Sequence, residues 1–411
     1  RERLYDQYQS LYGKQPTALL ALPLVAITVL DASAFQVGLL GTVEFAPFVL
    51  VGLPAGVWVD RLRRRPVLIA GDLGRAAALL SIPVAYQLDA LTIGQLYAVG
   101  FVTGVLTVFF DVAYQSYLPA LVEPDQLLEG NSKLEISRSG AQIAGPGLAG
   151  VLIDLVTAPV AVLADALSFA LSAAFVGVIR RGEAAPQRTP AHERRGSMRR
   201  EMAEGLRYVL GHRLLRPIAA CTATANLFNA VVYAVVILYM VRQLGLRPAA
   251  IGLVFAAGNV GFLVGAIVSG RLAARTGIGR AIVVGEAVGA LGALAIPLAP
   301  RQAAVPLLVA GMAVSTFGGT VYNVNQVSLR QAITPARLHG RMNATMRFMV
   351  WGTLPLGSLL GGALGTAIGL RPTLWVGAAG GLVAVLPVAL SPVRSLAAIA
   401  DAMPVHRGAQ A

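Results

Sequence analysis

Several carboxylates lie inside stretches of sequence that are otherwise apolar. Glu44, Asp72 and Asp111 interrupt such stretches in the first half, and Glu286 is the only acid between Pro217 and Pro392. A charge at the centre of a lipid bilayer costs at least about 2.5–3.5 kcal/mol. If the stretches cross a membrane, these acids therefore need a role, and reversible proton binding is the chemistry that suits them best.

Glu44 is the first candidate for proton binding, and Asp111 and Glu286 are the others. Glu44 lies nine residues inside one end of the apolar segment 35–59, which is about 13 Å at the helical rise and places it near a bilayer midplane. Asp111 could instead close a gate, and a glutamate paired with a polar neighbour for packing remains the alternative for Glu44. The two other acids, Asp154 and Asp165, lie nearer the ends of their segments.

Amides and aromatic residues inside the apolar segments form a second set, with chemistry suited to ligand binding. Aromatic faces and neutral amides opposite a carboxylate suit large, amphipathic and often cationic molecules. For each residue taken singly, hydrogen bonding between helices is the alternative. The predicted substrate-binding residues are Glu44, Asn226, Asn229, Tyr233, Asn259, Tyr322, Asn323, Asn325 and Trp351.

Other chemistry finds no support in the sequence. No phosphate-binding loop of the Walker A type occurs, so direct ATP coupling is not expected. The four histidines lack the spacing of metal ligands, and Cys221 is the only cysteine. We therefore predict no metal, no cofactor and no enzymatic activity.

The composition indicates that the candidate acids, amides and aromatic residues lie on membrane-spanning helices. The 411 residues are 56% hydrophobic and 13% charged, with a mean hydropathy of +0.69, whereas soluble domains carry about 25% charged residues. An all-α membrane protein follows, since a span needs about 20 apolar residues. The first span is short, with about 14 apolar residues in 17–30. The predicted spans are 17–30, 35–59, 66–88, 92–117, 137–157, 159–179, 217–243, 249–273, 280–299, 303–328, 341–368 and 371–391.

The net charge of +13 indicates topology and not nucleic-acid binding, because the arginines gather in alternate loops. Ten of them lie between Arg180 and Arg216, in a loop that we expect to be a cytoplasmic linker, and both termini are then cytoplasmic too. Within the linker, the segment from Met198 to Leu210 has helical spacing and could lie along the membrane surface. No cleavable signal peptide is evident.

The two halves of the chain repeat each other. The loop 56–65 aligns with 270–280 at an offset of 214, and the loop 122–127 aligns with 333–338 at an offset of 211. Two parallel six-helix repeats are typical of transporters. We expect two pseudo-symmetric six-helix bundles, 1–179 and 217–392, joined by a linker at 180–216 and followed by a cytoplasmic tail at 393–411.

Two motifs make the sequence resemble the major facilitator superfamily. Residues 56–65, GVWVDRLRRR, resemble that superfamily's signature loop, with Trp58, Val59 and Arg63 as departures. Residues 145–150, GPGLAG, resemble its antiporter motif, with Ala149 replacing a glycine. The sequences of residues 52–56 and 110–119 are similar to those of the drug:proton antiporter branch, which includes macrolide and siderophore exporters.

The resemblance implies a charged gate and a kinked fifth span. In the superfamily the loop aspartate, here Asp60, holds the inner ends of the two halves together, with the start of span eleven near Arg341 as its partner. The alternative for the arginines is that they only fix topology. Gly145, Pro146 and Gly150 would permit a kink and close helix approach, or ordinary packing. The predicted gate comprises Gly56, Asp60, Arg61, Arg64 and Arg65, with the i, i+3 pairs Asp72–Arg75 and Glu135–Arg138.

These observations predict a monomeric exporter of small amphipathic molecules in the inner membrane, driven by proton antiport through alternating access. Its partners would be a small-molecule substrate, protons and the lipid bilayer. A dedicated siderophore or secondary-metabolite exporter is the nearest alternative, and a proton-symport importer is a weaker one. The short first span keeps open a transport-inactive membrane scaffold or receptor.

Overall fold

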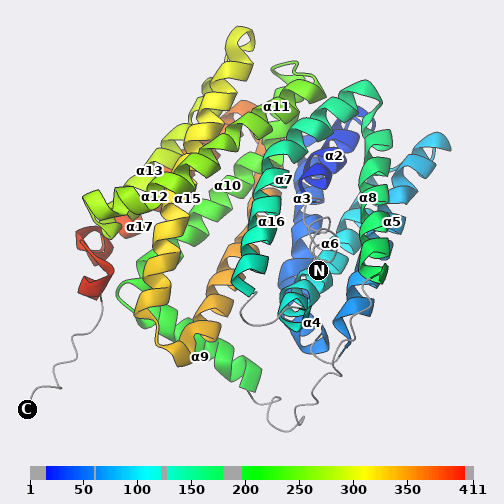
Figure 1. Ribbon diagram of the computed structural model, residues 1–411. Coiled ribbons are helices and arrows are strands. Elements are labelled where there is room, and N and C mark those ends of the chain that lie inside the picture. The colour runs from blue at the N-terminus through cyan, green and yellow to red at the C-terminus, as the bar shows by residue number, and fades with distance from the viewer. Residues whose placement is uncertain (1–14, 60–61, 122–126, 179–196, 403–411) are drawn as a thin grey trace, which may run out of the picture. The chain divides into compact units, whose positions relative to one another are not determined.

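A computed structural model describes residues 15–59, 62–121, 127–178 and 197–402, and this part of the chain is built from helices (Figure 1). In the first half, the helices follow the predicted spans within a few residues, except where a longer helix extends beyond them. They are α2 (Gln15–Thr28), α3 (Ala34–Leu50), α4 (Gly52–Val59), α5 (Arg64–Gln87), α6 (Ile93–Leu121), α7 (Leu127–Leu155) and α8 (Ala158–Val178).

The second half begins with a helix that belongs to the predicted linker, α9 (Ser197–Gly211). Short 3-10 turns precede α15 and α16 and follow α17. The other helices are α10 (Leu215–Arg242), α11 (Pro248–Gly258), α12 (Val260–Thr276), α13 (Ile278–Ala293), α14 (Ala295–Leu298), α15 (Ala304–Ile333), α16 (His339–Ala367) and α17 (Leu370–Ala389).

Three predicted spans are each divided into two helices. Pro54 and Pro297 have no N–H, so the carbonyls four residues earlier lose their helical donor, and α3 and α13 end near those points. Between α11 and α12 the cause is a side chain. The Thr316 hydroxyl of α15 donates to the Gly258 carbonyl at 2.7 Å, while the Phe262 N–H donates to Asn259.

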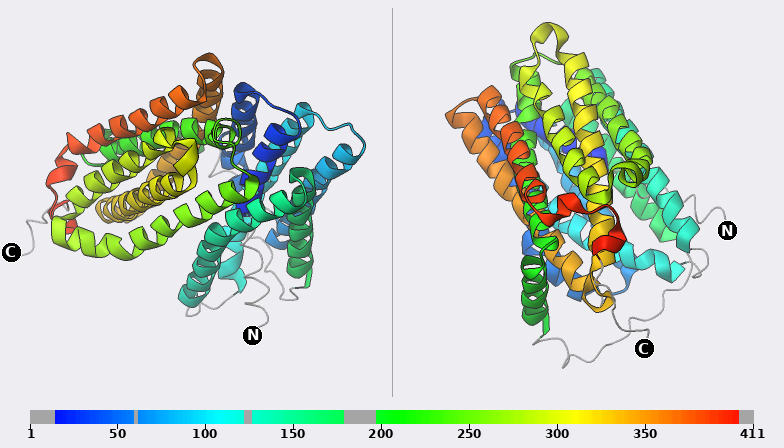
Figure 2. Two further views of the ribbon diagram at one scale, coloured as in Figure 1. Left: turned by 90° about the horizontal axis from the view of Figure 1, so that it is seen from above. Right: turned by 90° about the vertical axis from the view of Figure 1, so that its left-hand side faces the viewer.

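The chain forms two compact units, each with its own packing. Unit 1 comprises 1–189, 233–257 and 354–373, and unit 2 comprises 190–232, 258–353 and 374–411. Within unit 1, α6 packs against α3 and α5, and within unit 2, α15 packs against α12 and α13. These are the same pairs of spans counted from the start of each predicted bundle, so the pairing follows the internal repeat. Figure 2 gives two further views of the helices.

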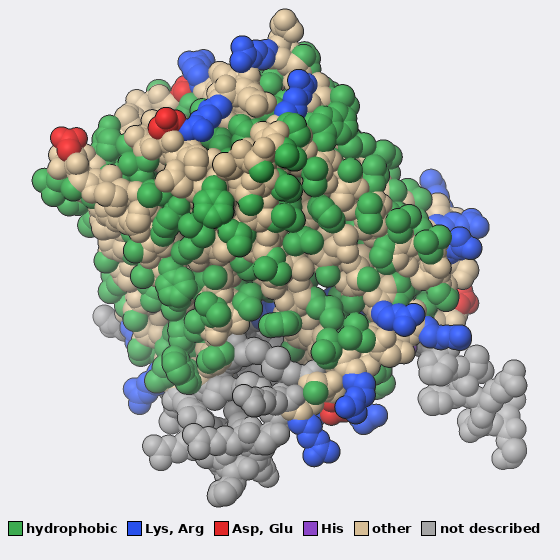
Figure 3. All heavy atoms as spheres, turned by 180° about the vertical axis from the view of Figure 1, so that it is seen from behind, with side chains coloured by type: hydrophobic (Ala, Val, Ile, Leu, Met, Phe, Trp, Pro, Cys, Tyr) green, Lys and Arg blue, Asp and Glu red, His purple; other side chains and the backbone are tan. Residues whose placement is uncertain are grey.

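Length and composition make these helices suited to a membrane. Within the described residues, nine helical segments are long and apolar enough to cross a bilayer, and 34–50 and 140–155 are shorter apolar helices. Hydrophobic side chains cover the middle of the face in Figure 3, whereas Lys and Arg gather toward its edges. This distribution is expected where lipid surrounds the middle of the spans.

Candidate functional site

Glu44 lies on α3 where that helix meets α6. A Cβ at Gly100 of α6 would be 3.1 Å from Glu44 Cγ, and one at Gly104 would be 2.6 Å from the Glu44 carbonyl oxygen. The Glu44 side chain is partly exposed, and no described residue forms a hydrogen bond or ion pair with its carboxylate. No side chain in the described part of the chain therefore fixes the protonation state of the Glu44 carboxyl group.

Asp72 and Arg75 form the ion pair that their spacing predicts, inside unit 1. Arg75 Nη2 lies 2.5 Å from Asp72 Oδ1, and the two side chains are 3% and 1% exposed. The guanidinium stands between two rings, 4.2 Å from the centre of Phe110 and 4.4 Å from that of Phe169. Asp111 is a further charged neighbour of Arg75. Aromatic faces and an acid thus replace water around this buried cation.

Replacing Asp72 by asparagine should destabilise the protein, because Arg75 would keep its charge without its closest acid. Removing one partner of a buried pair typically costs about 3–5 kcal/mol. We expect a clear fall in the thermal unfolding temperature of the purified protein. The control is Asp154→Asn, because Asp154 lies 3.7 Å from the exposed Arg247 and such surface pairs contribute little. Equal unfolding temperatures for the two variants would contradict the assignment.

The third predicted proton site, Glu286, lies in the interior of unit 2. It is 8% exposed on α13, with Tyr322 of α15 and Cys221 of α10 as electrostatic neighbours. The Tyr322 hydroxyl lies 2.7 Å from the Thr222 hydroxyl and donates to the Ile218 carbonyl at 3.3 Å. Tyr322 therefore joins α15 to α10 in this polar cluster within the apolar core.

The predicted substrate-binding amides divide into buried and exposed groups. Asn325 is buried and donates to the Ser269 hydroxyl and to the Val321 carbonyl, both at 2.8 Å. The Asn226 side chain donates to the Thr222 carbonyl at 2.7 Å and is partly buried. Asn229 and Asn323 are exposed, and Asn259 and Trp351 are partly exposed. Tyr233, 51% exposed, stacks on Phe255 within unit 1.

Two pairs of glycines bring helices of unit 1 into backbone contact. A Cβ at Gly38 of α3 would lie 2.5 Å from the Gly362 Cα of α16. A Cβ at Gly150 of α7 would lie 2.8 Å from the Gly252 Cα of α11 and 2.5 Å from the Pro248 carbonyl oxygen. Since backbone atoms cannot move aside as a flexible side chain can, no larger residue fits here. The GPGLAG motif thus supplies a close contact between α7 and α11.

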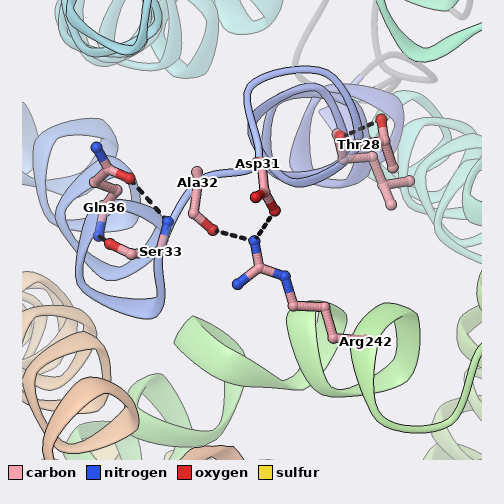
Figure 4. Close-up of polar contacts among 7 residues, drawn as sticks. Thr28, Asp31, Ala32, Ser33, Gln36 and Arg242 are labelled. Atoms are coloured by element: carbon pink, nitrogen blue, oxygen red, sulfur yellow. Dashed lines mark hydrogen bonds and ion pairs between the residues drawn. The ribbon is translucent and has the colours of Figure 1, made fainter.

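An ion pair joins the connection between α2 and α3 to the end of α10, also within unit 1. Arg242 Nη2 donates to Asp31 Oδ1 at 2.5 Å and to the Ala32 carbonyl at 2.9 Å (Figure 4). Directly afterwards, Ser33 and Gln36 form a capping box that begins α3. Neither Asp31 nor Arg242 could be predicted as a pair from the sequence, because two isolated charges that lie 211 residues apart give no pattern.

The residues of the signature loop are only partly described. Arg65 donates to the Val176 and Gly177 carbonyls, at 3.2 and 2.5 Å, and so satisfies the C-terminal end of α8. Asp60 and Arg61 lie outside the described residues, as do the side chains of Glu135 and Arg138. Arg341, expected near Asp60, pairs with Glu204 of α9 at 2.6 Å. The gate therefore stays a prediction.

A model of the Major Facilitator Superfamily matches residues 16–350 and 218–401 of the chain. The chain belongs to the Major Facilitator Superfamily. The fold is therefore the twelve-helix major facilitator fold that the sequence predicts, in a multi-pass membrane protein of a transporter family.

Two curated proteins resemble the chain. The multidrug efflux pump Tap of Mycolicibacterium fortuitum is 28% identical over 357 residues, which cover 84% of each chain. Macrolide efflux protein A of Streptococcus pyogenes is 24% identical over 182 residues, 42% of this chain and 44% of that protein. Among solved structures, a bacterial homologue of the iron transporter ferroportin in an inward-facing state covers 94% of this chain and 98% of its own, with a TM-score of 0.75 and 18% identity. That likeness concerns the fold alone.

Proposed function

We propose that this major facilitator protein exports small amphipathic molecules, of the drug or macrolide type, in exchange for protons. Similarity over 84% of the chain to a protein named as a multidrug efflux pump supports efflux. The observation that carries proton exchange is Glu44, a partly exposed carboxyl on a membrane-spanning helix without a described protein partner. Each proton that enters down a 100 mV potential releases about 2.3 kcal/mol, enough for useful efflux.

The orientation and the substrate contacts belong to the same proposal. With the arginine-rich loops on the cytoplasmic side, both termini are cytoplasmic and the Asp31–Arg242 pair lies on the outer side. The contacts between α3 and α16 and between α7 and α11 then seal the outer ends of these helices, and alternating access requires that they separate. The exposed or partly exposed Asn229, Asn323 and Trp351 provide amide and aromatic surface for the substrate.

A transport measurement tests this function directly. The purified protein is reconstituted in liposomes that contain a pH-sensitive dye, and macrolides and cationic dyes are offered as substrates. We expect substrate-dependent proton movement that empty liposomes lack, and reduced accumulation of the same compounds in cells that produce the protein. Proton movement that is independent of every compound, with unchanged accumulation, would contradict the proposal.

A further inference from the structure

Helix α9 is attached to unit 2 along one face. Gly205 lies against the start of α16, where a Cβ would be 2.6 Å from the Thr345 hydroxyl oxygen and 2.8 Å from the Arg341 carbonyl oxygen. Glu204 pairs with Arg341, and Val209 is fully buried in the core cluster of unit 2. The position of α9 against the end of a membrane span is thus fixed by packing and charge.

The end of α9 is also joined rigidly to the membrane span that follows it. The His212 Nδ1 accepts hydrogen bonds from the backbone N–H groups of Leu214 and Leu215, at 3.2 and 3.4 Å, at the start of α10. Partial burial lowers the pKa of the His212 imidazole below its usual value, which keeps it neutral at pH 7 and able to accept these bonds. Because α10 is a membrane span, α9 ends at the boundary of the bilayer.

The opposite face of α9 combines apolar and basic side chains. Leu206 and Leu210 share one stripe at i and i+4 and are 43% and 45% exposed. Arg200 and Arg207, at i and i+7, lie exposed beside that stripe, and the exposed Arg213 follows the helix. None of the three arginines forms an ion pair or hydrogen bond with a described residue.

We propose that this face of α9 is a binding surface for the headgroups of anionic phospholipids in the cytoplasmic leaflet. Leucines that insert at the headgroup boundary, with arginines beside them, are the pattern of interfacial helices. The negative surface potential of an anionic leaflet attracts basic groups within about one Debye length. Because α9 also packs against the start of α16, the lipid composition would affect how firmly the start of α16 is held. The inference rests on the proposed orientation but not on proton exchange.

The test places a reporter on the proposed surface of the full-length protein. Ala203 is exposed on the same side of α9, and A203C can be labelled with an environment-sensitive fluorophore because Cys221 is fully buried. The labelled protein is reconstituted in vesicles of phosphatidylcholine alone or with phosphatidylglycerol, without substrate or proton gradient. We expect a blue shift of the emission, and quenching by brominated lipids, only with phosphatidylglycerol, and both should weaken in high salt.

Two triple variants distinguish a specific surface from net charge. R200Q/R207Q/R213Q should abolish the response, because each arginine strengthens attachment to an anionic leaflet roughly fivefold and three of them roughly a hundredfold. The matched control, R271Q/R275Q/R280Q, removes the same charge from exposed positions at the end of α12 and the start of α13 and should keep the response. Equal emission in both vesicle types, equal loss in both triple variants, or competition by free inorganic phosphate would overturn the proposal. Since no transport is measured, failure of the exporter function would not affect the result.

Discussion

Replacing Glu44 by glutamine should reduce substrate-dependent proton movement to the level of empty liposomes. The amide has nearly the same shape but cannot bind a proton reversibly, so the exchange would lose its coupling group. The carboxylate contacts no described polar partner, so the loss should leave the fold intact. The measurement is the dye-based proton assay together with binding of a fluorescent substrate, which should persist.

Two further variants make the result specific. Glu44→Asp keeps a titratable group and should retain part of the activity, while Asp154→Asn removes an acid from a surface pair and should retain nearly all of it. Unchanged coupling in the glutamine variant would reject Glu44 as the proton site. Asp111, near the Arg75 cluster, and Glu286, near Tyr322, would then be the remaining acids to replace.

Gly150→Val should abolish transport while the protein still inserts and folds. The valine Cβ would meet the Pro248 carbonyl oxygen and the Gly252 Cα, so α7 and α11 could not approach as they do here. In the alternating-access cycle that we propose, this contact must form once in every cycle. We expect loss of drug resistance in cells, and a cysteine placed at the buried Ala32 should react with a membrane-impermeant reagent far faster than in the unmodified background.

The same helix provides the control for this variant. Gly140 of α7 has no described atom within 4 Å of an added Cβ, so Gly140→Val adds the same side chain without the clash at Gly150. It should transport normally and leave the cysteine at position 32 protected. If both valine variants transported equally well, the close contact at Gly150 would have no role in the cycle.

The helices could be predicted from the sequence because hydropathy over about 20 residues is a strong signal. The breaks near Pro54 and Pro297 have a local cause, since a proline removes a donor. A proline alone did not predict a break, however, because other prolines, such as Pro83 and Pro146, lie inside continuous helices. The break at Asn259 was not open to prediction, because its cause is the Thr316 hydroxyl, which lies 58 residues away along the chain. Such a contact exists only once the helices have packed.

The candidate site shows the same division between local and distant causes. The spacing of Asp72 and Arg75 predicts their pair, since residues three apart share a helix face. The rings of Phe110 and Phe169 around Arg75 come from two other helices, and no pattern in the sequence connects them. The Tyr322 hydroxyl, predicted to bind substrate, joins α15 to α10 through Thr222. Amides and tyrosines have the same spacing whether they bind a ligand or a neighbouring helix, so burial must decide.

The missing helical hydrogen bond between α11 and α12 marks one of two places where the protein can bend. The chain passes from unit 1 to unit 2 between Ala257 and Gly258, next to the missing helical bond, and returns to unit 1 between Thr353 and Leu354, just before Pro355 of α16. At both joints a helical hydrogen bond is already missing, because its donor is absent or engaged by another partner, so a bend there breaks fewer backbone hydrogen bonds than a bend in a continuous helical stretch. The two joints can therefore serve as hinges. A bend at either joint would leave the helical segments on both sides folded.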